Sequence, residues 1–211
     1  MSVIVIVPPA PFMTPAGIPG SHASDDAIVQ AWIDAAVAEL DGPDGWLGIA
    51  IGEQTLEYRL SGFPCTDGEI SLPCKPIISL TSIIYTDPEG AEKTMGGADY
   101  QFSQKDGIVR PAINAAWPTA RNVTGSVKIR YVAGFNGGAV ADGGTGEIPT
   151  RIRQGVVLLT QMYRNSGVET MFLSEVTLPG VETRKFVVSE ESGKVVRSAV
   201  QSLLAPLRQY W

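Results

Sequence analysis

The residue types that most often carry out catalysis are scarce in this sequence. Its one histidine, His22, lies in a proline-rich stretch, which is a poor platform for positioning a general base. No Gly-x-Ser-x-Gly motif indicates an activated serine. The acid pairs Asp25–Asp26 and Glu190–Glu191 stand at the expected starts of helices, where negative charge stabilises the helix dipole. We therefore expect no catalytic residues and no enzymatic activity.

Metal and cofactor chemistry has equally little support. One histidine and two cysteines do not make a zinc-binding cluster. We interpret Cys65 and Cys74 as buried or half-buried thiols, with a disulfide across a hairpin as the alternative. The glycine-rich segment 134–146 lacks the Gly-Lys-Ser/Thr ending of a phosphate-binding loop and contains Asp142. We expect a flexible loop there, and we predict no metal site and no cofactor.

The bulk composition is that of a folded globular protein. Of its 211 residues, 44% are hydrophobic and 18% are charged, and the net charge is −6. This acidic balance argues against a general nucleic-acid binder, which needs a basic face, but it permits a protein that lines a passage for DNA. No apolar run is long enough to span a membrane, and the apolar start is too short for a signal core. The sequence predicts a soluble, cytoplasmic protein.

Residues 1–23 are expected to form an extended N-terminal arm. The first 22 residues contain five prolines and no acid, lysine or arginine. Such an arm either rests on a neighbouring molecule or is disordered, and residues 3–7 have the composition of a strand that adds to another sheet.

Two blocks, residues 24–53 and 147–206, carry the helical patterns. Apolar residues recur at helical spacing through residues 25–40 and again after Pro149. A last helix is expected from about Glu190 until Pro206 breaks it, and residues 168–188 before it are irregular, with a hairpin around Leu178. These helices should form a small bundle.

Residues 54–133 between the two blocks read as an inserted antiparallel β-sheet or sandwich. Val127, Ile129 and Tyr131 alternate with polar residues, which predicts a central strand with one dry face. Ahead of this strand, Trp117 and Pro118 are expected to anchor a loop across the sheet, because a loop rarely leaves an indole in water. The predicted fold class is therefore α+β.

Two parts of the chain offer candidate binding surfaces. Residues 24–53 hold seven acids and no base, so they form either a solvated helix face or a face turned towards a DNA-conducting lumen or a basic partner. The tail, residues 207–211, ends in two aromatics that favour docking. The candidate acidic face comprises Asp25, Asp26, Asp34, Glu39 and Asp41, and the candidate tail comprises Leu207, Arg208, Gln209, Tyr210 and Trp211.

A series of short segments follows in a characteristic order: the acidic helix 25–40, Gln54-Thr-Leu-Glu-Tyr-Arg-Leu-Ser-Gly-Phe-Pro, Ile70-Ser-Leu-Pro, Pro76-Ile-Ile-Ser-Leu-Thr-Ser-Ile-Ile-Tyr, Asp87-Pro-Glu-Gly, Gly107-Ile-Val-Arg-Pro, Trp117-Pro, Val127-Lys-Ile-Arg-Tyr-Val-Ala-Gly-Phe, Ile148-Pro-Thr-Arg-Ile-Arg-Gln-Gly-Val-Val-Leu-Leu and Leu203-Leu-Ala-Pro-Leu-Arg. This order resembles the head–tail connector (adaptor) family of long-tailed bacteriophages, prophages and gene transfer agents. The resemblance covers roughly residues 24–165 and the last helix. The sequence departs from the family pattern in the long arm, the expanded glycine-rich loop and the insertion at residues 166–189.

The resemblance implies a structural role in the virion neck. Proteins of this family form a closed ring of roughly twelve copies below the portal protein, extend the DNA channel and carry a stopper or tail-terminator protein. It implies that the C-terminal tail reaches the portal and that double-stranded DNA passes without specific binding. The protein would be made in the cytoplasm of the bacterial host. A tail terminator or decoration protein is the alternative, and a small hydrolase is a third hypothesis.

Overall fold

The computed structural model describes residues 1–20, 26–64, 68–165, 175–178, 182–185 and 190–210. The chain divides into two compact units. Met1–Ala10, Asp41–Ile148 and the C-terminal residues from Gln209 make up a sheet unit, and Pro11–Leu40 with Pro149–Arg208 make up a helical unit. Three α-helices and antiparallel sheets among the described residues confirm the predicted α+β class.

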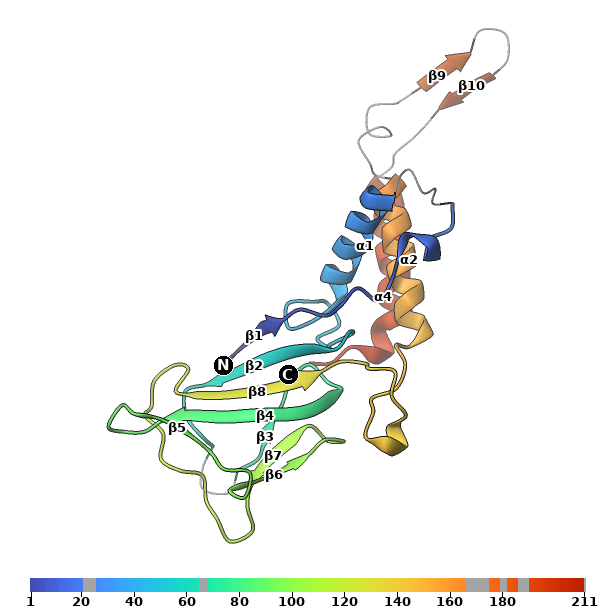
Figure 1. The fold of residues 1–211 in the computed structure, drawn as a ribbon. Helices are drawn as coiled ribbons and strands as arrows, with labels where there is room; N and C mark the ends of the chain where they lie inside the picture. Colours follow the sequence, from blue (N-terminus) through green and yellow to red (C-terminus); the bar gives the residue numbers. More distant parts are fainter. Residues whose placement is uncertain (21–25, 65–67, 166–174, 179–181, 186–189, 211) are drawn as a thin grey trace. The chain divides into compact units, whose positions relative to one another are not determined.

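The main sheet of the sheet unit has five antiparallel strands (Figure 1). Strand β8 lies at its centre, with β2 on one side and β4 on the other, which confirms the predicted central strand. β1 and β5 form the two edges. In spatial order the strands are β1 (Ser2–Val7), β2 (Gln54–Leu60), β8 (Val127–Ala133), β4 (Ile77–Thr86) and β5 (Glu92–Thr94).

The core of this unit lies between the main sheet and a smaller one. Alternation along β8 turns Val127, Ile129 and Tyr131 inward, and each is fully buried. Val109 and Ile70 of the smaller sheet pack into the same cluster. The three strands of the smaller sheet are β3 (Ile70–Ser71), β7 (Ile108–Pro111) and β6 (Tyr100–Ser103).

The start of the chain contains the strand that the composition of residues 3–7 predicted. This strand, β1, pairs antiparallel with β2 of the same chain, so residues 2–7 belong to the main sheet and do not extend as an arm away from it. Further along, Pro9 lies against Gly52, and Pro15–Gly17 forms a short 3-10 turn, η1. Pairing with the open edge of β2 supplies hydrogen-bond partners to the backbone of β1 and partly buries Val3 and Ile4.

The glycine-rich segment forms a loop, as predicted, and contains a short turn with hydrogen bonds of its own. Val140–Asp142 forms the 3-10 turn η3, and the backbone amide of Gly137 donates to the Gly146 carbonyl at 2.9 Å. The side-chain oxygen of Asn136 accepts hydrogen bonds from the backbone amides of Gly138 and Thr145. An asparagine that binds its own backbone holds such a turn without apolar packing, so hydrophobicity patterns do not reveal it.

The helical unit contains the three predicted helices. α1 (Asp26–Leu40) and α4 (Glu190–Leu204) both pack on α2 (Thr150–Asn165). α4 leads into η4, a 3-10 turn over Ala205–Leu207, where Pro206 was expected to end the helix. No described helix is long and apolar enough to cross a membrane.

The expected hairpin around Leu178 is present. β9 (Glu175–Leu178) pairs antiparallel with β10 (Glu182–Lys185), and the turn between them lies outside the described residues. The main segment of the sheet unit runs from Asp41 and not from residue 54, because the loop after α1 is hydrogen-bonded to the sheet unit. The backbone amide of Phe135, which follows β8, donates to the Ile51 carbonyl of this loop at 3.1 Å.

Two helical glycines provide a matched test of the packing between α2 and α4. A Cβ on Gly155 would lie 2.9 Å from the buried Leu204 side chain, whereas a Cβ on Gly193 would meet nothing closer than 4.0 Å. We expect Gly193→Ala to raise the free energy of unfolding by about 0.5–1 kcal/mol. Gly155→Ala should give no such gain, and Gly155→Val should cost about 1–3 kcal/mol. Urea denaturation of the three variants measures this, and equal stabilisation by both alanines would contradict the close packing.

Candidate functional site

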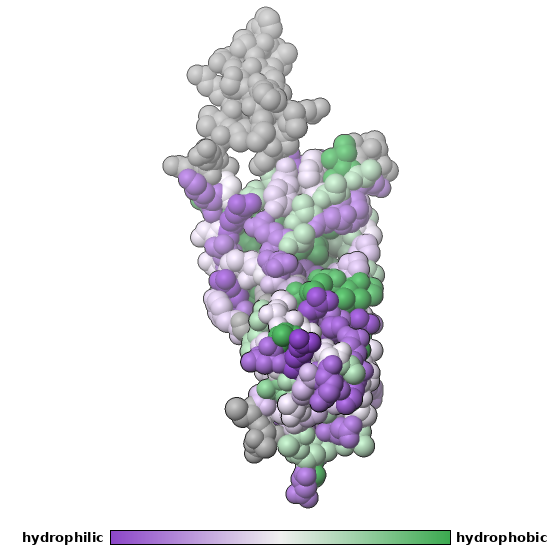
Figure 2. Space-filling model, turned by 90° about the vertical axis from the view of Figure 1, so that its left-hand side faces the viewer, coloured by the Kyte–Doolittle hydropathy of each residue, from purple (hydrophilic) through white to green (hydrophobic). Residues whose placement is uncertain are grey.

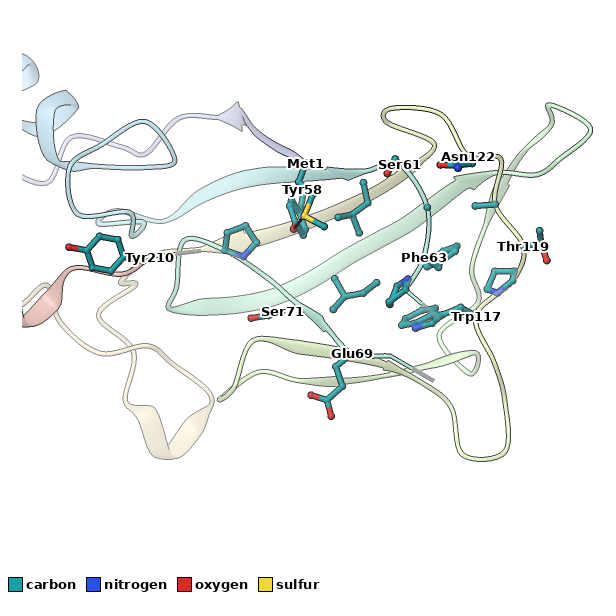
Figure 3. Close-up of a pocket in the computed structure, with 17 residues that line it drawn as sticks. Met1, Tyr58, Ser61, Phe63, Glu69, Ser71, Trp117, Thr119, Asn122 and Tyr210 are labelled. Carbon is teal, nitrogen blue, oxygen red and sulfur yellow. Dashed lines mark hydrogen bonds between the residues drawn. The ribbon is translucent and has the colours of Figure 1, made fainter. Parts of the chain in front are cut away.

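An open groove of about 940 Å³ lies in the sheet unit (Figure 3). Phe63 and Trp117 lie side by side at one end and Tyr210 lies at the other, with Met1 and Tyr58 between them. Its lining joins segments that are far apart in the sequence: the chain start, the segment after β2, the loop before β8 and the C-terminal residues. The lining residues are Met1, Tyr58, Leu60, Ser61, Gly62, Phe63, Pro64, Glu69, Ile70, Ser71, Pro73, Trp117, Pro118, Thr119, Ala120, Asn122 and Tyr210.

An aromatic cluster fixes one end of the groove. The rings of Phe63 and Trp117 stack with their centroids 4.9 Å apart, and Tyr85 meets the edge of Phe63 at 5.6 Å. The indole Nε1 of Trp117 donates a hydrogen bond of 2.6 Å to the Gly68 carbonyl, so the one polar group of this largely buried ring has a partner. The loop containing Trp117 and Pro118 is therefore pinned to the segment between β2 and β3.

The lining of the groove has the chemical character of a surface that binds another molecule. Its lining combines aromatic rings and prolines with the hydroxyls of Ser61, Ser71 and Thr119. Its one carboxylate, Glu69, forms an ion pair of 2.9 Å with Arg110. An apolar surface with a few hydroxyls binds by burying area and exchanging hydrogen bonds, as peptide-binding grooves do.

A charged cluster lies on the opposite face of the main sheet. Glu57 of β2 accepts hydrogen bonds from Arg59 at 2.7 Å and from Arg130 of β8 at 2.9 Å, and its side chain is only 5% exposed. Burial acts to raise the pKa of Glu57, but the hydrogen bonds and positive charges of Arg130 and Arg59 outweigh it and hold the pKa below its ordinary value. The Arg130 ion pair thus links β8 to β2, whereas the Arg59 pair lies within β2.

The C-terminal tail is tied down at its start and exposed at its end. Leu207 and Arg208 are half-buried, and the backbone amide of Gln209 donates a hydrogen bond of 2.8 Å to the Leu47 carbonyl. The side chain of Tyr210 is 81% exposed. Trp211 lies outside the described residues. Among the described residues of the predicted docking tail, Gln209 and Tyr210 are therefore the exposed ones.

The structure separates the five acids of the candidate face. Asp26 and Asp34 are exposed on α1. Glu39 is engaged within the helical unit, where it accepts a hydrogen bond from the Tyr163 hydroxyl and lies 3.6 Å from Arg197. Asp25 lies outside the described residues.

Asp41 follows the end of α1 and is turned into the protein. Its carboxylate accepts hydrogen bonds from the backbone amide of Ile51 at 2.5 Å and from Nε2 of Gln54 at 3.0 and 3.1 Å. Burial raises the pKa of Asp41, and these donors partly offset that effect. Asp41 is a loop anchor in this structure and does not share the exposed helix face of Asp26 and Asp34.

Cys74 has the surroundings of an inert thiol. It is fully buried, and burial raises its pKa to about 12, so little of the nucleophilic thiolate forms at neutral pH. Cys65 and His22 lie outside the described residues. Among the residues that the structure describes, no group of three or more His, Cys, Asp and Glu side chains could hold a metal ion.

Sequence reasoning missed two sets of residues that shape these surfaces. Phe63 stacks on Trp117 across more than fifty positions, and Tyr163 reaches Glu39 from another helix. The helical spacing of Tyr163 predicted only a buried position. The available signal for Phe63 was its place beside a proline, as for Trp117 beside Pro118. This signal is weak because large aromatic residues are common in any core.

Exposed aliphatic side chains are scattered over the surface, except along β1. Figure 2 shows one face of the molecule, on which hydrophilic residues predominate and hydrophobic ones form separate patches. Three consecutive residues of β1 are exposed, whereas the others stand apart in the sequence. Besides Met1, the exposed large hydrophobic residues are Val5, Ile6, Val7, Ile28, Ile113, Val123, Val140, Val195 and Tyr210.

The Glu57 cluster gives a pH-dependent prediction. Because the folded state lowers the pKa of Glu57, its contribution to stability is complete above the ordinary value of 4.5 and is lost as the pH falls through the lowered pKa. We expect Glu57→Gln to lower the free energy of unfolding by about 1–2 kcal/mol at neutral pH. The deficit should shrink in acid. Urea titrations at several pH values measure this, with exposed Glu89→Gln as the control, and a deficit independent of pH would contradict the ion pairs.

Comparisons with known proteins find likeness at the level of structure. No family model matches the sequence, and no curated protein matches it. A chain from the neck of an empty gene transfer agent (GTA) particle, computed with C6 symmetry, matches with a TM-score of 0.60 and 19% identity, covering 100% of this chain and 97% of that one. A chain of the native GTA virion matches with a TM-score of 0.59 and 18% identity, covering 100% of this chain and 97% of that one. A chain from the neck of the native GTA particle, computed with C12 symmetry, matches with a TM-score of 0.53 and 18% identity, covering 98% of this chain and 96% of that one. The chain thus shares its entire fold with these chains.

Proposed function

We propose that this chain is a head–tail connector (adaptor) in the neck of a tailed phage or phage-like particle. The observation that carries the proposal is the likeness of fold along essentially the full length of both chains to a component of a GTA neck. The order of sequence segments supports the same family independently. The chain would act through shape and binding, without catalysis and without a cofactor, after synthesis in the cytoplasm of the bacterial host.

The connector is proposed to form a closed ring of twelve copies beneath the portal protein. Two of the matching neck structures were computed with C6 and C12 symmetry, and a twelve-fold ring is compatible with both. A ring of identical copies requires each copy to present two different surfaces that fit each other. The ring would extend the DNA channel and provide a platform for a stopper or tail-terminator protein.

Imaging of the particle neck tests this function directly. The chain, labelled by a small tag on an exposed loop, is expected as a ring between portal and tail in every particle. The same image separates the connector from the alternative roles of tail terminator or decoration protein, which place the label elsewhere. Absence of the label from the neck would disprove the proposal.

Portal binding is assigned to the end of the C-terminal tail. Tyr210 is strongly exposed, while the hydrogen bond between Gln209 and Leu47 fixes the base of the tail. A large aromatic side chain held at a fixed exit point is a suitable anchor for a hydrophobic pocket on a partner.

A substitution at Tyr210 tests that assignment. We expect Tyr210→Ser to leave the thermal midpoint of unfolding within about 1 °C, because the side chain buries little, and to weaken portal binding at least about tenfold. Ile113→Ser, at another exposed apolar side chain, is the matched control and should bind normally. Binding of purified portal by interferometry gives the readout, and unchanged binding by Tyr210→Ser would contradict the role of the tail.

The channel wall is assigned to the exposed acids of α1. Residues 24–53 contain no base, and Asp26 and Asp34 both face solvent. A wall of negative charge repels DNA phosphates weakly and lets the duplex slide, whereas a basic wall would hold it by releasing counterions.

Charge reversal on α1 tests the channel assignment. The double variant Asp26→Lys with Asp34→Lys should fold and assemble normally, yet reduce DNA delivery at least about tenfold, because lysines in the wall would retain phosphates. Glu89→Lys with Asp142→Lys changes the same number of exposed charges in the sheet unit and should deliver DNA normally. Delivery is scored as infectious or transducing titre per assembled particle. A normal titre for the α1 variant would remove the channel role while leaving the neck location intact.

A further inference from the structure

The two edge strands of the main sheet differ in how well they are protected against pairing with another chain. β5 is short and exposed at all three residues, and two of its side chains form ion pairs: Glu92 with Lys128 at 2.6 Å and Lys93 with Asp87 at 2.8 Å. Charges of this kind keep an edge strand from pairing with another chain. β1 has neither charge nor proline in its six residues.

The outer edge of β1 has the properties of a docking edge. β1 pairs with β2 along one side, and no other described strand lies beside it. Val5, Ile6 and Val7 are 39%, 41% and 53% exposed, and a register irregularity between Val5 and Val7 leaves Ile6 without a partner on β2. A row of unpaired backbone groups bordered by branched apolar side chains is the arrangement that accepts an added strand.

The described part of the chain also contains a separate two-stranded sheet. Among the described strands, β9 and β10 pair only with each other. A two-stranded hairpin is at best marginally stable in water unless it joins a larger sheet or packs on another element. By sequence, β10 carries three charged residues in four, whereas β9 carries one, so β9 has the less defended edge.

From these observations we propose that the outer edge of β1 pairs with β9 of a second copy of this chain. β1 belongs to the sheet unit and β9 to the helical unit, so the contact joins two different surfaces, as a head-to-tail ring requires. One copy supplies the unprotected edge of β1, and the next supplies β9, whose hairpin gains stability by joining a larger sheet. Backbone hydrogen bonds give the contact its strength, and the apolar side chains of β1 become covered. This inference rests on the proposed ring and names the contact that closes it.

A single lysine on β1 tests the edge. Ile6→Lys introduces the charge that natural edge strands use against pairing, at a side chain already 41% exposed. We expect this full-length variant to remain folded by circular dichroism and to self-associate at least about tenfold more weakly in analytical ultracentrifugation. Val195→Lys, on the exposed side of α4, is the matched control and should associate like the unmodified protein. Unchanged association of Ile6→Lys would overturn the proposal.

Cross-linking between two differently substituted chains identifies the partner strand. Ile6→Cys and Thr177→Cys, each in a chain without Cys65, are prepared separately and mixed under mild oxidation. A disulfide-linked dimer should form only in the mixture and should not form when Val195→Cys replaces Thr177→Cys. The same pairs are tested in assembled particles. Failure to cross-link both in solution and in particles would overturn the assignment of β9.

The experiment separates this contact from the proposed function. Particles that keep a labelled ring in the neck when built with Ile6→Lys would refute the β1 contact and leave the connector role standing. Conversely, cross-linking in solution together with absence from the neck would support the contact and refute the connector role.

Discussion

Strand β8 is hydrogen-bonded along both edges, to β2 on one side and to β4 on the other, and most of the sheet unit is arranged by this pairing. Its register directs Tyr131 inward, where the ring is fully buried and the hydroxyl donates a hydrogen bond of 3.0 Å to the Pro73 carbonyl. The same register directs Arg130 outward to Glu57. A slip by one residue would exchange these faces, placing an arginine in the core and a tyrosine on the surface.

The candidate binding surfaces therefore depend on the sheet without being part of its central strand. The aromatic groove is built on the inner side, where Trp117 is carried by the loop that leads into β8. The ion-paired face lies on the outer side. Loops tied to a rigid sheet can change in sequence while the sheet keeps them in place, so contacts made by such loops can change without a change of fold.

Partly buried carboxylates link neighbouring segments within each unit. The Asp41 carboxylate accepts hydrogen bonds from Ile51 and Gln54, which hold the segment after α1 on the main sheet. Glu39 joins two helices through Tyr163. Removing a carboxylate from water costs free energy that its hydrogen-bond partners must offset, so these residues fix geometry more than they add stability.

The sequence by itself determined the α+β class, the helices around Val29, Val156 and Val200 and the central strand through Ile129, because periods of two and of about 3.6 residues are local properties. Only the tertiary structure decided that residues 2–7 join their own sheet, that Asp41 turns inward while Asp34 stays exposed, and that Phe63 meets Trp117. The physical reason is that pairing partners and side-chain donors lie tens of residues apart. Hydrophobic periodicity states which face of a strand or helix is buried, but not which distant segment covers it.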